Sequence, residues 1–91
     1  MTTKIISNSQ VKAVRTLPEL CREIRKDWGS KMYFGAVPYF KAMETLNNVG
    51  ENYGMDSGKS IVLYFLANAQ TWKGPIAKQV KIELKKLAGV K

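Results

Sequence analysis

A run of apolar residues between positions 57 and 70 restricts the fold of this chain more than any other feature of its sequence. These residues recur at spacings of three and four and fall on one broad helical face; they are Ile61, Val62, Phe65, Leu66 and Ala69. Burial of the four large side chains would contribute roughly 6–12 kcal/mol before the entropy cost is subtracted. We therefore expect a helix over residues 57–70 at the centre of the core.

Two segments before this helix also have the signals of helices. Thr16 and Glu19 have the spacing of a capping box, and the helix that they begin is expected to end near Gly29. Its apolar stripe consists of Leu17, Leu20, Cys21, Ile24 and Trp28. A second helix is expected to begin at Pro38. The polar, glycine-rich residues 47–54 that follow it are interpreted as a loop and not as a strand.

The last helix is expected to begin at Pro75, because proline suits the first position of a helix, and to end at Gly89. Its apolar stripe consists of Ile76, Val80, Leu84 and Leu87. The four segments together predict a mainly α fold, with about four helices around the apolar helix 57–70. The length of the chain indicates a single domain, residues 1–91, in which residues 1–15 form either a short strand pair or an arm.

Composition excludes several classes of function. The chain of 91 residues has no histidine, which is the commonest general base and the commonest metal ligand. Its single cysteine, Cys21, excludes an internal disulfide and is expected to be a small core residue. The longest apolar run is far shorter than the roughly 20 residues that span a bilayer. We therefore expect no enzyme, no cofactor, no metal site and no membrane segment.

The stretch from Gly54 to Ser60, GMDSGKS, ends like the phosphate-binding loop of a nucleotide-binding protein. Such a loop needs a glycine five residues before its second glycine, and that position is Tyr53. We therefore interpret the stretch as the start of a helix, with Asp56 or Ser57 as the cap. A weak anion site at the same helix start, aided by Lys59, is the alternative.

The net charge of +8, from fifteen Lys and Arg against seven Asp and Glu, favours a polyanion or an acidic protein surface as the partner. Two helical faces are the candidate binding surfaces. They comprise Arg22, Arg25 and Lys26 on the first helix, and Lys73, Lys78, Lys81 and Lys85 before and along the last. Positive charge along a helix can follow a phosphate backbone. Two solvated faces without a partner are the equal alternative.

Other polar and aromatic residues have structural interpretations. The carboxylates of the first helix are expected to pair with its own basic residues, and they are Glu19, Glu23 and Asp27. A cluster of aromatic residues near Lys31 and Lys41 is expected to pack in the core and in loops, with stacking of single-stranded bases as the alternative. Its members are Tyr33, Phe34, Tyr39 and Phe40. Trp28 and Trp72 are expected in the core.

Residues 53–88 resemble the C-terminal half of small proteins encoded by phages and prophages. The shared pattern comprises Tyr53, Asp56, Ser57, Ile61, Val62, Tyr64, Phe65, Leu66, Asn68, Ala69, Thr71, Trp72, Lys73 and Gly74. The resemblance extends weakly back to about residue 20. It implies a phage accessory protein that acts in the host bacterial cytoplasm.

Two functions are consistent with this resemblance. The first is an anti-CRISPR inhibitor, which binds a host CRISPR-Cas surveillance complex through its protein and guide RNA and blocks target DNA. These complexes hold DNA in positively charged channels, so a basic inhibitor would not mimic DNA but would contact exposed RNA or acidic surface. The second is a non-enzymatic phage accessory protein that binds free DNA or RNA directly.

Overall fold

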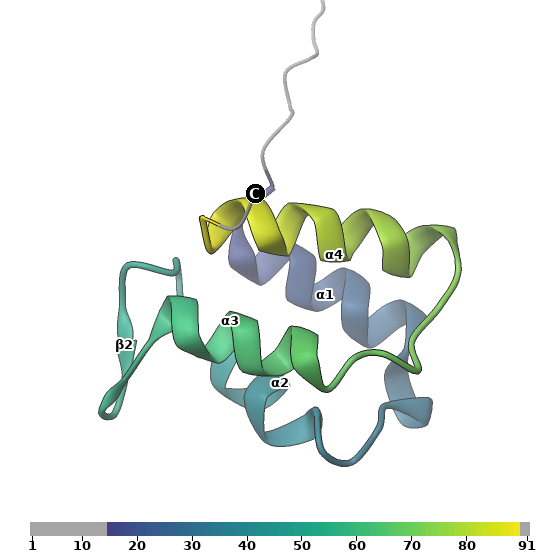
Figure 1. Cartoon of the computed structure of the whole chain (residues 1–91), viewed down its shortest axis with the longest axis horizontal. Coiled ribbons are helices and arrows are strands. Elements are labelled where there is room, and N and C mark those ends of the chain that lie inside the picture. Colours follow the sequence, from purple (N-terminus) through teal and green to yellow (C-terminus); the bar gives the residue numbers. More distant parts are fainter. Residues whose placement is uncertain (1–14, 90–91) are drawn as a thin grey trace, which may run out of the picture.

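The computed structural model describes residues 15–89, which form a mainly α fold of four α-helices and a small antiparallel hairpin (Figure 1). In chain order the elements are α1 (Leu17–Asp27), the short 3-10 helix η2 (Gly29–Lys31), α2 (Val37–Glu44), β2 (Asn52–Tyr53), β3 (Asp56–Ser57), α3 (Gly58–Ala67) and α4 (Pro75–Leu87). The predicted fold class is confirmed. Residues 1–14, which carry nearly all of the expected strand pair or arm, lie outside the described residues.

The starts of α1 and α3 follow from local capping. The Thr16 hydroxyl accepts a hydrogen bond from the Glu19 N–H at 3.3 Å, and the Glu19 carboxylate accepts one from the Thr16 N–H at 2.7 Å. This reciprocal pair is the predicted capping box. At α3 the Ser57 hydroxyl accepts from the Ser60 N–H at 3.1 Å, so Ser57 is the cap. The interpretation of GMDSGKS as a helix start is confirmed.

The hairpin corrects one expectation from the sequence. Residues 47–54 were expected to contain no strand, yet Asn52–Tyr53 pairs with Asp56–Ser57 in an antiparallel register. Gly54 makes the tight turn between them with a φ of 60°, a left-handed conformation that favours glycine. The pairing is only two residues long on each side, so its alternation is too short to recognise as a strand pattern.

Close backbone packing ties this hairpin to α3. The Gly58 N–H donates to the Glu51 carbonyl at 2.7 Å. A Cβ atom on residue 58 would lie 2.6 Å from the carbonyl oxygen of Val49, so only glycine allows this approach.

Helix α3 ends earlier than expected, at Ala67 instead of residue 70. The Asn68 side chain donates to the Tyr64 carbonyl at 2.9 Å, and the Asn68 N–H contacts the carbonyls of Tyr64 and Phe65. Asparagine thereby satisfies the last carbonyls of the helix and favours its end over its continuation.

The core lies between two pairs of helices: α1 packs beside α4, and α2 packs beside α3 (Figure 1). Each helix turns most of its apolar stripe inward; the exception is Ile76 of the predicted α4 stripe, which is exposed, whereas the adjacent Ala77 is buried. The largest fully buried side chains are Phe65, Leu17, Leu20, Ile24, Met43, Leu84, Val62 and Val80. Cys21 is also buried, as expected, and burial raises the pKa of its thiol to about 12.

Aromatic rings connect α2, α3, the end of α1 and the connection before α4 through the core. Phe65 of α3 meets the edge of Trp28 at a centroid distance of 6.0 Å and Phe40 of α2 at 6.4 Å. Trp28 in turn stacks on Trp72 at 5.4 Å, with only 8° between the ring planes. Both tryptophans are buried, which confirms their predicted place in the core.

Substitution of Phe65 by alanine is expected to lower the free energy of unfolding by about 3–5 kcal/mol, because it opens a cavity beside two aromatic rings. Leu63→Ala in the same helix is the matched control. Its side chain is 42% exposed, so its loss should cost about 1 kcal/mol or less. Urea denaturation of both variants measures the difference. Equal losses would contradict the assignment of Phe65 to the core.

Candidate anion-binding pocket on helix α4

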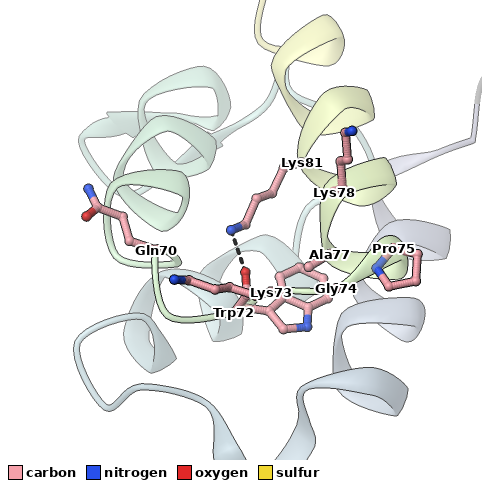
Figure 2. Close-up of a pocket in the computed structure, with 8 residues that line it drawn as sticks. All are labelled: Gln70, Trp72, Lys73, Gly74, Pro75, Ala77, Lys78 and Lys81. Carbon is pink, nitrogen blue, oxygen red and sulfur yellow. Dashed lines mark hydrogen bonds between the residues drawn. The ribbon is translucent and has the colours of Figure 1, made fainter.

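A pocket of about 480 Å³ lies where the connection from α3 meets the start of α4 (Figure 2). Three of the predicted site residues line it: Lys73 from the connection, and Lys78 and Lys81 from successive turns of α4. The remaining lining comes from the first turn of α4 and the buried Trp72 and is mostly apolar, and Gln70 lies at the edge with its amide pointing away from the lysines. The pocket therefore combines positive charge with an apolar surface.

Lys81 is the most constrained of these lysines. Its ammonium donates to the Trp72 carbonyl at 2.6 Å and lies 6.0 Å from the centroid of the Trp72 ring. The pKa of Lys81 lies below its ordinary value because burial strips water from the ammonium, and Lys73 and Lys85 add nearby like charge. Lys81 thus faces the pocket and is not a freely solvated member of a stripe.

The start of α4 adds a further positive element. Gly74 is its N-cap, with a φ of 111° that favours glycine, and no side chain caps the first turn. The first N–H groups of a helix have no intrahelical partner and carry the positive end of the helix dipole. The pocket therefore lies beside a helix end that suits an anion.

The lysines of this pocket form no ion pair with a carboxylate of the described residues. In the part of the chain that the structure describes, the ion pairs are Arg15–Glu23, Arg15–Glu83 and Arg25–Glu44, and none includes a lysine. Lys85 extends the same helical row, is exposed, and lies outside the pocket lining.

The predicted basic residues of α1 are arranged differently. Arg25 is bound to Glu44 of α2 at 2.6 Å and lies over the Phe40 ring, 5.2 Å from its centroid, so it joins two helices. Arg22 and Lys26 are exposed. They line a separate hollow of about 280 Å³ that also contains two carboxylates, and it shares no residue with the lysine pocket. The structure therefore does not join the two predicted basic faces into one surface.

The expected pairing within α1 is wrong. Glu19 serves the capping box, Glu23 accepts from Arg15 at 2.7 Å, and Asp27 accepts from the Trp72 indole at 2.8 Å. Arg25 pairs with a different helix instead. Contacts between helices compete successfully with pairs along one helix, because an exposed intrahelical pair is worth only about 0.3–0.5 kcal/mol.

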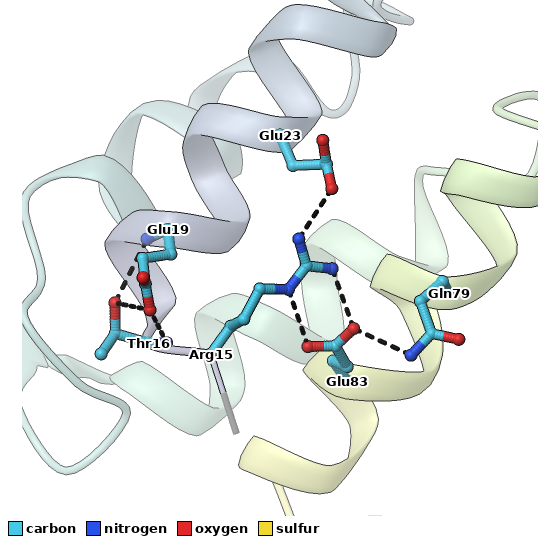
Figure 3. A network of polar contacts seen from close by, with 6 residues as sticks. All are labelled: Arg15, Thr16, Glu19, Glu23, Gln79 and Glu83. Carbon is cyan, nitrogen blue, oxygen red and sulfur yellow. Dashed lines mark hydrogen bonds and ion pairs between the residues drawn. The ribbon is translucent and has the colours of Figure 1, made fainter. Parts of the chain in front are cut away.

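A network around Arg15 joins α1 to α4 (Figure 3). The Arg15 guanidinium donates to both oxygens of Glu83, at 2.9 and 2.8 Å, and to Glu23 at 2.7 Å. Gln79 donates to Glu83 as well. The hydrogen bond from Arg15 lowers the pKa of the Glu83 carboxyl. Because Asp27 and Trp72 meet at the other end of α1, the two helices run antiparallel.

The aromatic cluster is divided by the fold. Phe40 is buried and Tyr39 packs against the core, as expected. Tyr33 and Phe34 are 42% and 80% exposed, and their ring centroids lie 4.9 Å apart. Tyr33 and Phe34 therefore lie outside the core and pack on each other in the segment before α2, with their rings partly open to solvent.

No family model, curated protein or solved structure matches this chain. Within residues 15–89, no group of three or more Cys, Asp or Glu side chains is placed to hold a metal ion. Among the same residues, no helix has both the length and the apolar character that crossing a membrane requires.

Acidification is expected to weaken the link between α1 and α4. The pKa of Glu83 is lowered in the folded protein, so its stabilising effect is present above the unfolded-state pKa, roughly 4.3, and is lost as the pH falls through the folded-state value. Glu83→Gln should lower the free energy of unfolding by about 1.5–3 kcal/mol at pH 7 and flatten this acid dependence. Denaturation from pH 7 to pH 3 measures both effects.

Glu44→Gln is the control for this experiment, because Glu44 also accepts an ion pair, but from the well-exposed Arg25. An exposed pair contributes about 0–1 kcal/mol. If Glu83→Gln had no more effect on the pH profile than Glu44→Gln, the network would not be the link that we describe.

Proposed function

We propose that this protein is a non-enzymatic binding protein that contacts an anionic surface of a nucleoprotein complex through the lysine pocket. One observation carries the proposal: Lys73, Lys78 and Lys81 line a single pocket and pair with no carboxylate of the described residues. Unneutralised cations beside an apolar wall attract anions more strongly than cations in bulk water, because the wall focuses their field.

A host CRISPR-Cas surveillance complex is the partner that we propose, and the host bacterial cytoplasm is the place of action. The resemblance to phage proteins supports this choice. The division of charge supports it too: Arg22 and Lys26 share their hollow with carboxylates, so the protein presents separated patches of different charge. Such a surface suits a mixed surface of RNA and protein better than a uniform duplex backbone. Binding there would block the entry of target DNA.

Direct binding of free DNA or RNA is the second candidate. The exposed rings of Tyr33 and Phe34 favour it, because exposed aromatic rings can stack on unpaired bases. The two candidates differ in one simple respect. A free nucleic-acid binder shifts DNA by itself, with an affinity that falls steeply with salt, whereas the inhibitor acts only through the complex.

The test is a gel shift of target DNA by a purified surveillance complex, with and without this protein. The native protein should abolish the shift of the complex and leave DNA alone unshifted. The variant Lys73→Glu with Lys78→Glu should inhibit at least about tenfold less, because charge-assisted contacts are worth about 1.5–3 kcal/mol each.

Lys31→Glu with Lys41→Glu is the matched control, because it makes the same change of net charge at exposed positions outside the pocket. Loss of inhibition in this control alone would place the contact near Tyr33 and Phe34. It would contradict binding through the lysine pocket. A shift of DNA by the protein alone would favour the second candidate.

A further inference from the structure

We propose that the lysine pocket is a seat for one phosphate dianion, the terminal phosphate of a nucleotide or of a nucleic-acid strand. This inference rests on the proposed function in one respect, that the pocket meets an anion, and it specifies the chemistry of that anion. A terminal phosphate monoester carries nearly two charges at neutral pH, whereas each phosphate within a strand carries one.

The positions of the cations favour a compact anion over an extended backbone. Lys73 and Lys81 come from different segments and reach the same side of Trp72 (Figure 2). Lys78 also lines the pocket, but its ammonium points along α4 and away from those two. Cations grouped around one hollow concentrate their field at one place, whereas a surface that follows a backbone spreads its charge along a line.

Lys81 is oriented toward this place before any ligand binds. The Trp72 carbonyl accepts its hydrogen bond at 2.6 Å and so holds the ammonium against the wall of the pocket. Like charge from Lys73 and Lys85 and the loss of water both disfavour the charged form of Lys81 and lower its pKa. A bound dianion would relieve both effects, because it supplies an opposite charge and new hydrogen-bond acceptors.

The backbone at the start of α4 supplies a second set of donors. Helix α4 is 13 residues long, and its first turn has no capping side chain. A Cβ atom added to Gly74 would meet no atom within 4 Å, so the space beside this N-cap residue is open. Free N–H groups and the helix dipole favour a phosphate at such a position, and the pocket that Lys73 and Lys81 line adjoins it.

The size and the wall of the pocket favour an organic phosphate. A volume of about 480 Å³ lies within the range of about 300–1,000 Å³ for pockets that hold organic ligands, and it is larger than a phosphate alone needs. The apolar part of the lining, to which the exposed Pro75 belongs, offers contact for a sugar or a base. These features suit a nucleotide.

The intrinsic fluorescence of the full chain provides the measurement. The chain has two tryptophans, and one of them, Trp72, lines the pocket while it stacks on the other. The protein is titrated with a short single-stranded oligonucleotide carrying a 5′-phosphate, with the same oligonucleotide carrying a 5′-hydroxyl, and with inorganic phosphate. We expect the 5′-phosphate form to bind at least about tenfold more tightly than the 5′-hydroxyl form.

Lys73→Gln should remove most of this preference, and Lys41→Gln, an exposed lysine of α2 with the same change of charge, should keep it. Saturation by inorganic phosphate at the same concentration as the 5′-phosphate oligonucleotide would support the seat and identify free phosphate as its source. Equal affinity for the two oligonucleotides would overturn the phosphate seat. Equal effects of Lys73→Gln and Lys41→Gln would overturn its location.

The outcomes for this seat and for the proposed function are separable. Equal affinity for both oligonucleotides would remove the phosphate seat and leave a general contact with polyanions in place. Conversely, a preference for the 5′-phosphate that depends on Lys73, together with no effect of the native protein on DNA binding by the surveillance complex, would retain the seat and remove the inhibitor function.

Discussion

The stack of Trp28 on Trp72 is the contact on which the rest of the structure depends. It joins the end of α1 to the connection between α3 and α4, and the Trp72 indole also donates to Asp27 at 2.8 Å. Phe65 of α3 packs against Trp28 in an edge-on arrangement. A residue held by its ring and by its N–H has little freedom, so its backbone is fixed as well. The Trp72 carbonyl, which accepts the hydrogen bond from Lys81, is therefore held in place by the packing of the core.

The distribution of charge follows from which cations the packing of the helices uses. Arg15 and Arg25 each bind carboxylates of another helix, and both are arginines, whose planar fork can donate two hydrogen bonds at once. The lysines of α4 have no such partner among the described residues. Three lysines without an ion pair among the described residues therefore line one mostly apolar pocket, and a net charge alone could not indicate that place.

Sequence reasoning found part of the candidate site and misread the rest. Spacing along α4 placed Lys78 and Lys81 on one helical face, and both residues line the pocket. The same reasoning placed Arg25 on a binding face and expected charge pairs only within its own helix, since its partner Glu44 lies on another helix. It also left Arg15 unassigned in a segment interpreted as an arm, although Arg15 binds a carboxylate 68 residues away. The apolar wall beside Trp72 has no signature in the local sequence.

The sequence by itself determined the helices, their starts and their buried faces. A cap such as Ser57 and a stripe such as that of α3 act over three or four residues, and these interactions are complete within the segment that carries them. Only the tertiary structure decided which charges are used between helices, how Asn52–Tyr53 pairs, and that Lys81 turns toward Trp72. Those outcomes depend on distances between segments that the fold brings together, and on the water that packing removes from them.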